Sequence, residues 1–121
     1  RILEIGTYTG YSALCLAEGL KPGGSLITID PNEETNHFAS RFIQRSVYKD
    51  QIQLITGQAQ TVIPSLTRQF GLVFIDADKK NYGLYYDLVI DKVKQGGVIV
   101  ADNVLWSGKV LNEKKDVETE A

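Results

Sequence analysis

Residues 1–12 read RILEIGTYTGYS, and this stretch decides the fold class. Residues 1–5 form a short, mainly apolar run of strand length, whereas the apolar residues of segment 11–20 have helical spacing. Gly6 and Gly10 lie between these two segments, where glycine allows a tight turn and a close approach of the backbone to a ligand. The stretch therefore predicts a strand, a glycine turn and a helix in succession.

The remainder of the chain repeats this alternation of strand and helix. Further strands are expected at residues 25–29, 51–56, 71–76 and 98–101, the last after a turn at Gly96-Gly97. Helices are expected from the cap Asn32 to about residue 48, at 58–69, where Pro64 must restart or kink the helix, and at 82–94. Apolar strands alternating with helices predict a parallel sheet, and right-handed crossovers place helices on both faces. The expected fold class is α/β, with a doubly wound, mainly parallel Rossmann-like sheet.

Composition narrows the class of protein. The chain has 121 residues and a net charge of −2, which fits one domain over residues 1–121 and gives no electrostatic surface for nucleic acid or an anionic membrane. No apolar run is long enough to cross a bilayer. Because the chain has no methionine and its last residues are polar, we expect the domain to be truncated at both ends.

Cys15 is the only cysteine and His37 the only histidine. A single cysteine allows no disulfide within the chain, which fits a reducing compartment such as the cytoplasm. We expect Cys15 to be buried on an apolar helix face and His37 to lie on the surface of its helix. One cysteine and one histidine cannot form a structural zinc site, so any metal must be bound mainly by oxygen. Tyr82, Tyr85 and Tyr86 have helical spacing and are interpreted as packing residues.

Polar residues follow several of the expected strands, at the edge where ligands bind in sheets of this kind. Gly6 and Gly10 have the spacing G-x-x-x-G, whereas a dinucleotide-binding turn has the spacing G-x-G-x-x-G. This difference argues against NAD or FAD and fits S-adenosylmethionine, which has no phosphate. Asp30 follows the second strand and can accept both ribose hydroxyls of an adenosine-type cofactor. The alternatives are an ordinary glycine turn and a solvated aspartate before Pro31.

Acidic residues follow the fourth and fifth expected strands. Asp76 and Asp78 come after the fourth strand, and Asp102 and Asn103 follow the fifth. A cluster of carboxylates beside apolar strands is costly unless its charge is paired or bound to a metal. Asp76, Asp102 and the Asn103 carbonyl are hard oxygen ligands, which suit Mg²⁺, Ca²⁺ or Mn²⁺. The alternative is a pair of turn-forming aspartates with nearby lysines as counter-charges.

Three motifs together resemble one known family. They are LEIGTYTGYS at residues 3–12, FIDADKKNY at residues 74–82 and ADNVLWSG at residues 101–108. In this order, each at a strand end, they resemble the caffeoyl-coenzyme A and catechol type of class I S-adenosylmethionine-dependent O-methyltransferases. The resemblance extends from Arg1 to about Val110 and implies a partial methyltransferase fold.

The resemblance implies roles for individual residues. The implied cofactor-binding residues are Glu4, Gly6, Thr7, Ser12, Asp30, Ala59 and Asp78. Of these, Asp30 would hold the ribose, Ala59 would lie beside the adenine, and Asp78 would contact the cofactor's amino group. The implied metal ligands are the same three oxygen donors, Asp76, Asp102 and Asn103. Lys79 is at the position of the catalytic lysine.

The resemblance also implies a substrate and an assembly. The substrate would be a catechol-like or other vicinal diol, methylated with the help of Mg²⁺ or a similar cation, and the assembly would be a homodimer. Ser107 stands where the plant enzymes that use coenzyme A esters carry asparagine, which argues against that substrate.

Two other functions are compatible with the expected fold. The first is a nucleotide-dependent oxidoreductase, against which the missing G-x-G-x-x-G spacing argues. The second is a non-catalytic module that keeps only the cofactor pocket. The complete set of Asp76, Lys79, Asp102 and Asn103 argues against that second alternative. Fold alone does not decide among them, because this architecture hosts many chemistries.

Overall fold

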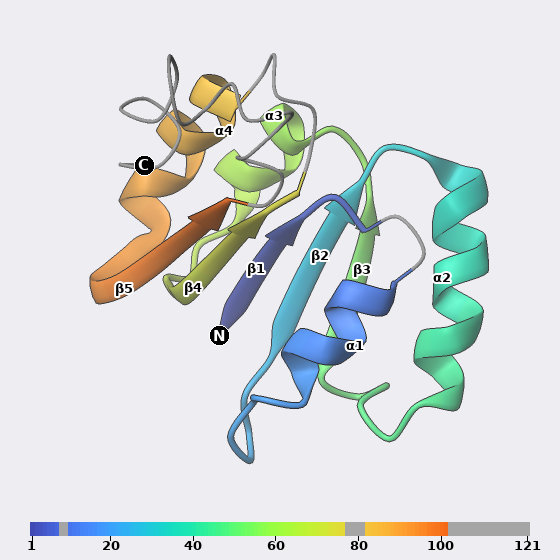
Figure 1. The fold of residues 1–121 in the computed structure, drawn as a ribbon. Coiled ribbons are helices and arrows are strands. Elements are labelled where there is room, and N and C mark those ends of the chain that lie inside the picture. Colours follow the sequence, from blue (N-terminus) through green and yellow to red (C-terminus); the bar gives the residue numbers. More distant parts are fainter. Residues whose placement is uncertain (8–9, 77–81, 102–121) are drawn as a thin grey trace, which may run out of the picture.

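The protein forms a five-stranded parallel sheet with helices on both faces. The structure is a computed structural model that describes residues 1–7, 10–76 and 82–101. The strand order is β3-β2-β1-β4-β5, and all four neighbouring pairs are parallel (Figure 1). The strands are β1 (Ile2–Ile5), β2 (Leu26–Asp30), β3 (Ile52–Thr56), β4 (Phe70–Ile75) and β5 (Val93–Ala101). The predicted α/β fold class is confirmed.

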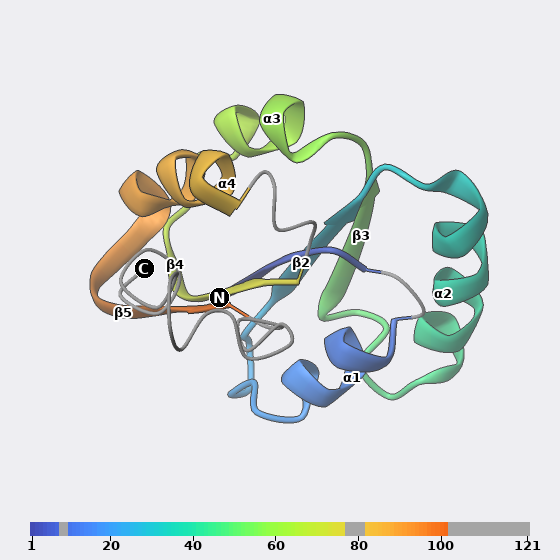
Figure 2. The same cartoon turned by 45° about the horizontal axis from the view of Figure 1, so that its top comes forward.

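Two pairs of helices cover the sheet. Figure 2 shows α1 (Tyr11–Ala17) and α2 (Glu33–Arg45) on one face, with α3 (Ala59–Val62) and α4 (Tyr82–Val89) on the other. Right-handed crossovers between parallel strands produce such an arrangement. Among the described residues, no helix has the length and apolar character needed to cross a bilayer.

The core has two parts, one on each face of the sheet. Successive strand residues point to opposite faces, so Leu3 and Ile5 of β1 join the cluster under α3 and α4, which also includes Phe70 and Val89. The second cluster lies under α1 and α2 and consists of Ala13, Ala17, Leu26, Ile43 and Ile52. Full burial of one large apolar side chain stabilises a fold by about 1.5–3 kcal/mol. These two clusters therefore hold the helices against the sheet.

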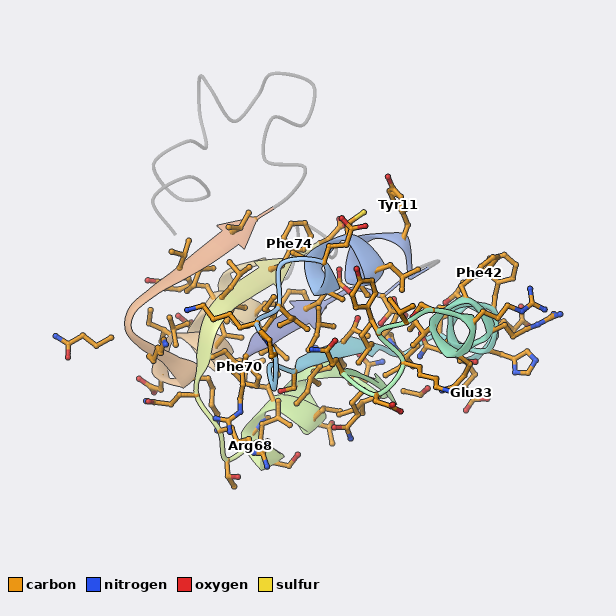
Figure 3. All side chains as sticks on the ribbon, turned by 90° about the horizontal axis from the view of Figure 1, so that it is seen from below. Tyr11, Glu33, Phe42, Arg68, Phe70 and Phe74 are labelled. Carbon is orange, nitrogen blue, oxygen red and sulfur yellow. The ribbon has the colours of Figure 1, made fainter. Side chains whose placement is uncertain are left out.

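The second helix begins as its sequence predicts. The Asn32 side chain accepts a hydrogen bond from the Thr35 backbone N–H at 3.0 Å, and Glu33 and Glu34 lie in the first turn. The helix ends at Arg45, earlier than the predicted residue 48. Figure 3 shows Phe42 of this helix and Tyr11 of α1 projecting away from the sheet.

The helix predicted at residues 58–69 is shorter and in two pieces. α3 ends at Val62, and a 3₁₀ turn, η1 (Ile63–Ser65), follows it with Pro64 near its start. Proline lacks the N–H that an α-helix interior requires, so the helical hydrogen-bond pattern changes at this point. The helix predicted at residues 82–94 also ends early, because α4 passes into a second 3₁₀ turn, η3 (Ile90–Lys92).

The prediction for the fifth strand was wrong at its start. β5 begins at Val93 and continues through Gly96 and Gly97, where a turn was expected. Its pairing with β4 shifts register there, since Phe70 pairs with Val93 but Leu72 pairs with Val98. Gly96 absorbs the irregularity with a φ of 84°, a conformation that glycine adopts without steric cost.

Cys15 is exposed, and the prediction that it is buried was wrong. The buried face of α1 carries Ala13 and Ala17, which are four residues apart. Side chains four residues apart share a helix face, so Cys15, midway between them, lies on the opposite side. His37 is exposed on α2, as predicted.

Candidate cofactor site

The carboxyl ends of three central strands meet at one edge of the sheet. Gly6 follows β1, Asp30 ends β2, and Asp76 follows β4. The Gly6 N–H donates to the Ile29 carbonyl at 2.8 Å, and the Asp76 N–H donates to the Ile5 carbonyl at 2.9 Å. Parallel pairing therefore brings these three positions together although they are far apart in the sequence.

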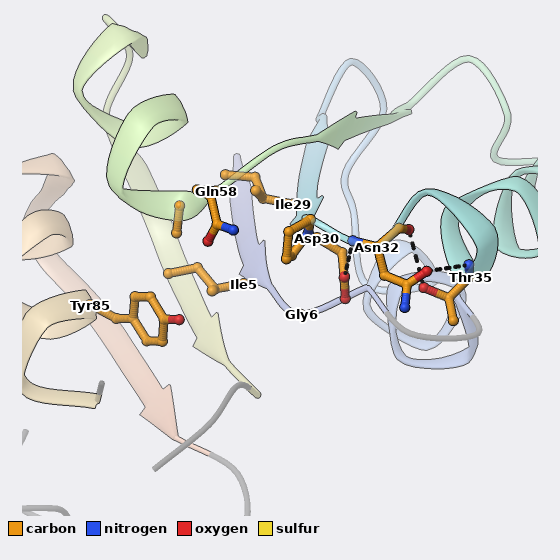
Figure 4. Close-up of a pocket in the computed structure, with 10 residues that line it drawn as sticks. Ile5, Gly6, Ile29, Asp30, Asn32, Thr35, Gln58 and Tyr85 are labelled. Atoms are coloured by element: carbon orange, nitrogen blue, oxygen red, sulfur yellow. Dashed lines mark hydrogen bonds between the residues drawn. The ribbon is translucent and has the colours of Figure 1, made fainter. Parts of the chain in front are cut away.

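A cavity of about 310 Å³ opens at this edge. Its walls include Gly6, Asp30 and Ala59, three of the predicted cofactor-binding residues, together with the apolar side chains of Ile5 and Ile29 (Figure 4). This volume lies at the lower end of the range for small-molecule sites, which combine apolar walls with a few polar groups. The predicted ribose and adenine contacts thus line one cavity.

Two backbone donors hold the Asp30 carboxylate in place. The Thr7 N–H donates to Asp30 Oδ2 at 3.1 Å, and the Asn32 N–H donates to Asp30 Oδ1 at 2.9 Å. The side chain is almost fully buried, with 6% of its surface exposed. A carboxylate has about four acceptor positions, two on each oxygen, and each Asp30 oxygen accepts one of these two bonds. The arrangement places a fixed carboxylate at the wall of the cavity.

Asn36 of α2 holds the backbone of Asp30 through a hydrogen bond to its carbonyl oxygen. Its Nδ2 donates to the Asp30 carbonyl at 2.8 Å and to Thr56 Oγ1 at 3.0 Å, which ties the ends of β2 and β3 to α2. Within the part of the chain that the structure describes, the buried Asn36 Oδ1 has no hydrogen-bond partner. Nothing in the helical pattern of the sequence distinguishes Asn36 from a surface asparagine, so it was not among the predicted site residues.

Tyr85 has two roles in the structure. It is buried in the core cluster under α4, as its helical spacing predicts, but it also lines the cavity near Ile5 (Figure 4). Its helical spacing alone predicted only the packing role. Its position in the first turns of α4, directly after the acidic segment, was the available signal for a place at the site.

Glu4, Thr7 and Ser12 belong to a buried polar network rather than to the cavity wall. Glu4 is fully buried, its Oε2 accepts a hydrogen bond from the Ser12 hydroxyl, and its Oε1 accepts one from Thr28 Oγ1 at 2.6 Å. The Thr7 and Thr28 hydroxyl oxygens are 2.7 Å apart. Burial raises the pKa of Glu4, while the hydrogen bonds from Ser12 and Thr28 oppose that shift. Thr28, like Asn36, was not among the residues predicted for the site.

Comparison with known proteins agrees with this geometry. A family model described as O-methyltransferase matches residues 1–121. The chain belongs to the O-methyltransferase family. It is 38% identical over 122 residues to the catechol O-methyltransferase of Mycobacterium tuberculosis, with 100% of this chain and 56% of that protein covered. It is 40% identical over 114 residues to the caffeoyl-CoA O-methyltransferase of Mesembryanthemum crystallinum, with 89% and 45% covered. The chain therefore spans about half the length of these curated relatives.

Solved structures of family members share the fold. The O-methyltransferase TomG from Streptomyces achromogenes, in complex with SAM, matches with a TM-score of 0.87 and 33% identity over 93% of this chain and 52% of that one. The O-methyltransferase from Bacillus cereus, in complex with SAH, matches with a TM-score of 0.85 and 36% identity over 92% and 52%. This chain therefore resembles both proteins in sequence as well as in fold.

The predicted metal-binding and catalytic residues fall mostly outside the described residues. Asp76 lies half-buried after β4. Asp78, Lys79, Asp102 and Asn103 all lie outside the described ranges. Among the residues that are described, no group of three His, Cys, Asp or Glu side chains is placed to hold a metal. The predicted metal site and the predicted catalytic lysine therefore stay predictions.

Proposed function

We propose that this chain forms the S-adenosylmethionine-binding part of an enzyme that methylates a hydroxyl of a catechol-like or other vicinal diol. The observation that carries the proposal is the Asp30 carboxylate, held by two backbone N–H groups at the wall of a cavity of about 310 Å³. Membership of the O-methyltransferase family supports the reaction type. Relatives described as catechol and caffeoyl-CoA O-methyltransferases support a phenolic substrate.

The residues of the site suit the parts of this cofactor. Asp30 would accept the ribose hydroxyls, as carboxylates at this position do in related sheets. Ala59 and Tyr85 would enclose the adenine between apolar surfaces, and Gly6 would let the backbone pass close to the sulfonium. Glu4 and Asp78 would provide negative charge toward the cofactor's ammonium group. A network with Ser12 and Thr28 holds the Glu4 carboxylate in place.

The reaction is a direct transfer of one methyl group. A substrate hydroxyl oxygen attacks the methyl carbon, a C–O bond forms, and the C–S bond breaks to leave a neutral thioether. The Lys79 amine accepts the hydroxyl proton and becomes an ammonium, which keeps protons and charge in balance. The protein's main contributions are alignment of the two reactants and exclusion of water.

Asp76, Asp102 and Asn103 are the residues that would hold a divalent cation beside the substrate. Carboxylate and amide oxygens are hard donors, so this set suits Mg²⁺, with Ca²⁺ and Mn²⁺ as alternatives. When bound, such a cation supplies positive charge that lowers the pKa of the substrate hydroxyls.

Substitution of Asp30 tests the cofactor part of the proposal. In the full-length protein with excess chelator, Asp30→Ala should weaken S-adenosylmethionine binding by about 1.5–3 kcal/mol, the range for hydrogen bonds to a charged group. The exposed Asp50, at the opposite end of the sheet, is the matched control, and Asp50→Ala should leave the calorimetric affinity unchanged. Equal affinities of the two variants would place the ribose elsewhere.

A methyl-transfer assay tests the reaction itself. The full-length protein should methylate at least one member of a panel of catechols, and Mg²⁺ should raise the rate over that in excess chelator. Cofactor binding without transfer to any diol would favour the non-catalytic module. Tight binding of NAD in place of S-adenosylmethionine would favour the oxidoreductase.

A further inference from the structure

Thr28 is a buried hydroxyl on β2 that lies directly beside Glu4. The two residues are register partners on neighbouring parallel strands. Ile27 and Ile29, the neighbours of Thr28, contact the core on the face of α3 and α4. Thr28 therefore points to the other face, under α1, where Ser12 reaches Glu4 from the first turn of that helix. Both Thr28 and Glu4 are fully buried.

The direction of each hydrogen bond in this network follows from counting hydrogens. Glu4 accepts one hydrogen bond at each carboxylate oxygen, from Ser12 and from Thr28. A threonine hydroxyl has one hydrogen, and that of Thr28 is used by Glu4. The 2.7 Å contact between the Thr28 and Thr7 hydroxyls is therefore a bond that Thr7 donates.

The same network reaches Asp30 at the wall of the cavity. Thr7, which donates its hydroxyl to Thr28, also donates its backbone N–H to Asp30 Oδ2 at 3.1 Å. A continuous series of hydrogen bonds thus links Glu4 to Asp30 through Thr28 and Thr7. Gly6, which lines the cavity, directly precedes Thr7 in the sequence.

We propose that Thr28 is a positioning residue for the methyl donor. Its hydroxyl fixes the Glu4 carboxylate and the Thr7 turn relative to each other, so the negative charge at the methionine end keeps its place relative to the ribose acceptor Asp30. The role rests on the proposed function, since it assigns the two carboxylates to two ends of one cofactor. Desolvation disfavours ionised Glu4, and the Thr28 hydroxyl supports the ionised form that attracts an ammonium group.

Thr28→Val tests this role in the full-length protein. Valine keeps the shape of threonine but leaves Glu4 Oε1 without its donor and the Thr7 hydroxyl without its acceptor. We expect the calorimetric Kd for S-adenosylmethionine to rise by about tenfold or more, the scale for a lost hydrogen bond to a charged group. The KM for the same donor should rise in parallel, while kcat at saturating donor and diol should stay within about twofold.

Two further variants separate positioning from simple destabilisation. Thr28→Ser keeps the hydroxyl and should restore the wild-type Kd. Ile43→Val removes one methylene from the core under α2, away from the network, and should lower thermal stability without changing the Kd. All affinities are measured well below each variant's melting temperature. Failure of serine to restore binding, or an equal loss of affinity in Ile43→Val, would contradict the role of the hydroxyl.

The remaining outcomes also test whether Thr28 positions the methyl donor. If Thr28→Val does not fold, Thr7→Val serves instead, because it removes the hydroxyl that donates to Thr28. Wild-type affinity for S-adenosylmethionine in Thr7→Val would overturn the proposal. Wild-type affinity in a folded Thr28→Val would overturn it directly. If the wild-type protein itself does not bind S-adenosylmethionine, the proposed function fails, which is a different result from a normal wild type with an unaffected variant.

Discussion

At the scale of single residues, the site depends on how carboxylates are held. Asp30 is fixed by two backbone N–H groups, whereas Glu4 is fixed by side-chain hydroxyls. Backbone donors at a strand end are present whatever the neighbouring side chains are. Hydroxyl donors exist only where serine or threonine stands at the right position, here Ser12 on α1 and Thr28 on β2. The position of Glu4 is therefore more sensitive to substitution of neighbouring residues than that of Asp30.

The burial of Glu4 makes stability depend on pH. Its folded-state pKa is raised above 4.5, mainly by desolvation. Between the pKa of Glu4 in the unfolded chain and its raised pKa in the folded protein, the folded state binds more protons than the unfolded state. The free energy of unfolding should therefore fall as pH rises through this interval. Glu4→Gln has no such group, so its stability relative to wild type should increase from pH 4 toward neutral pH. Urea unfolding of both proteins without cofactor, at several pH values, measures the difference. A constant difference would contradict the raised pKa.

Substitution of Lys79 distinguishes the proposed enzyme from a non-catalytic binding module. If its amine accepts the hydroxyl proton, Lys79→Ala should lower kcat by about 10²–10⁴-fold, the usual contribution of general acid–base catalysis. Affinity for S-adenosylmethionine should barely change, because Asp30 and the glycine turn are intact. Steady-state kinetics with a confirmed diol and saturating metal measures the effect. Lys80→Ala is the matched control and should cost little, whereas equal, small effects of the two substitutions would remove Lys79 from the mechanism.

At the scale of elements, Gly97 in β5 and Gly83 in α4 differ in their surroundings. A Cβ on Gly97 would lie 2.6 Å from Val93 Cγ1 and 2.9 Å from the Lys94 carbonyl oxygen, whereas a Cβ on Gly83 would meet nothing within 4 Å. Gly97→Ala should therefore destabilise the protein by about 1–3 kcal/mol, as overpacking does. Gly83→Ala, in α4, should stabilise it by about 0.4–1 kcal/mol. Chemical denaturation measures both, and effects of the same sign would contradict the close approach at β5.

The elements were predictable where local chemistry decides them. Asn32 caps α2 because its side chain accepts a hydrogen bond from a backbone N–H three residues later, a contact that the sequence alone specifies. The start of β5 was not predictable, since Gly96-Gly97 is a common turn signal. Pairing with β4 converts it into an irregular strand segment, and that pairing partner is more than twenty residues away. Tertiary pairing overrode local preference there.

The same division applies to the site. Glycines and acidic residues after strands indicated Gly6 and Asp30, which line the cavity, because parallel topology alone brings strand ends together. Thr28 and Asn36 have no such signal. Their roles arise from register and from the packing of α2 against the strand ends, which become visible only when the hydrogen-bond partners are known.

At the scale of the whole molecule, ligand binding should stabilise the fold. S-adenosylmethionine at 100 times its Kd should add about 2.7 kcal/mol to the free energy of unfolding, because it binds the folded state alone. For a protein of 150–250 residues this raises the melting temperature by about 5–10 °C. NAD at the same concentration should leave the melting temperature unchanged, and a thermal scan with each ligand measures both effects. A larger shift with NAD would reverse the assignment of the cofactor.

The central position of β1 has a consequence for synthesis of the chain. Ile2 pairs with Leu72, seventy positions later. At about 5–20 residues per second, a ribosome needs roughly 4–14 seconds to make the intervening segment. During that interval β1 can pair with β2 but exposes its other edge, and exposed edges invite association between nascent chains. Before β2 has paired with β1, a strand of another chain that paired with β1 would have to bury the Glu4 carboxylate without the Thr28 hydroxyl that supports it. The cost of burying Glu4 thus disfavours such association until Thr28 has been synthesised and β2 has paired with β1.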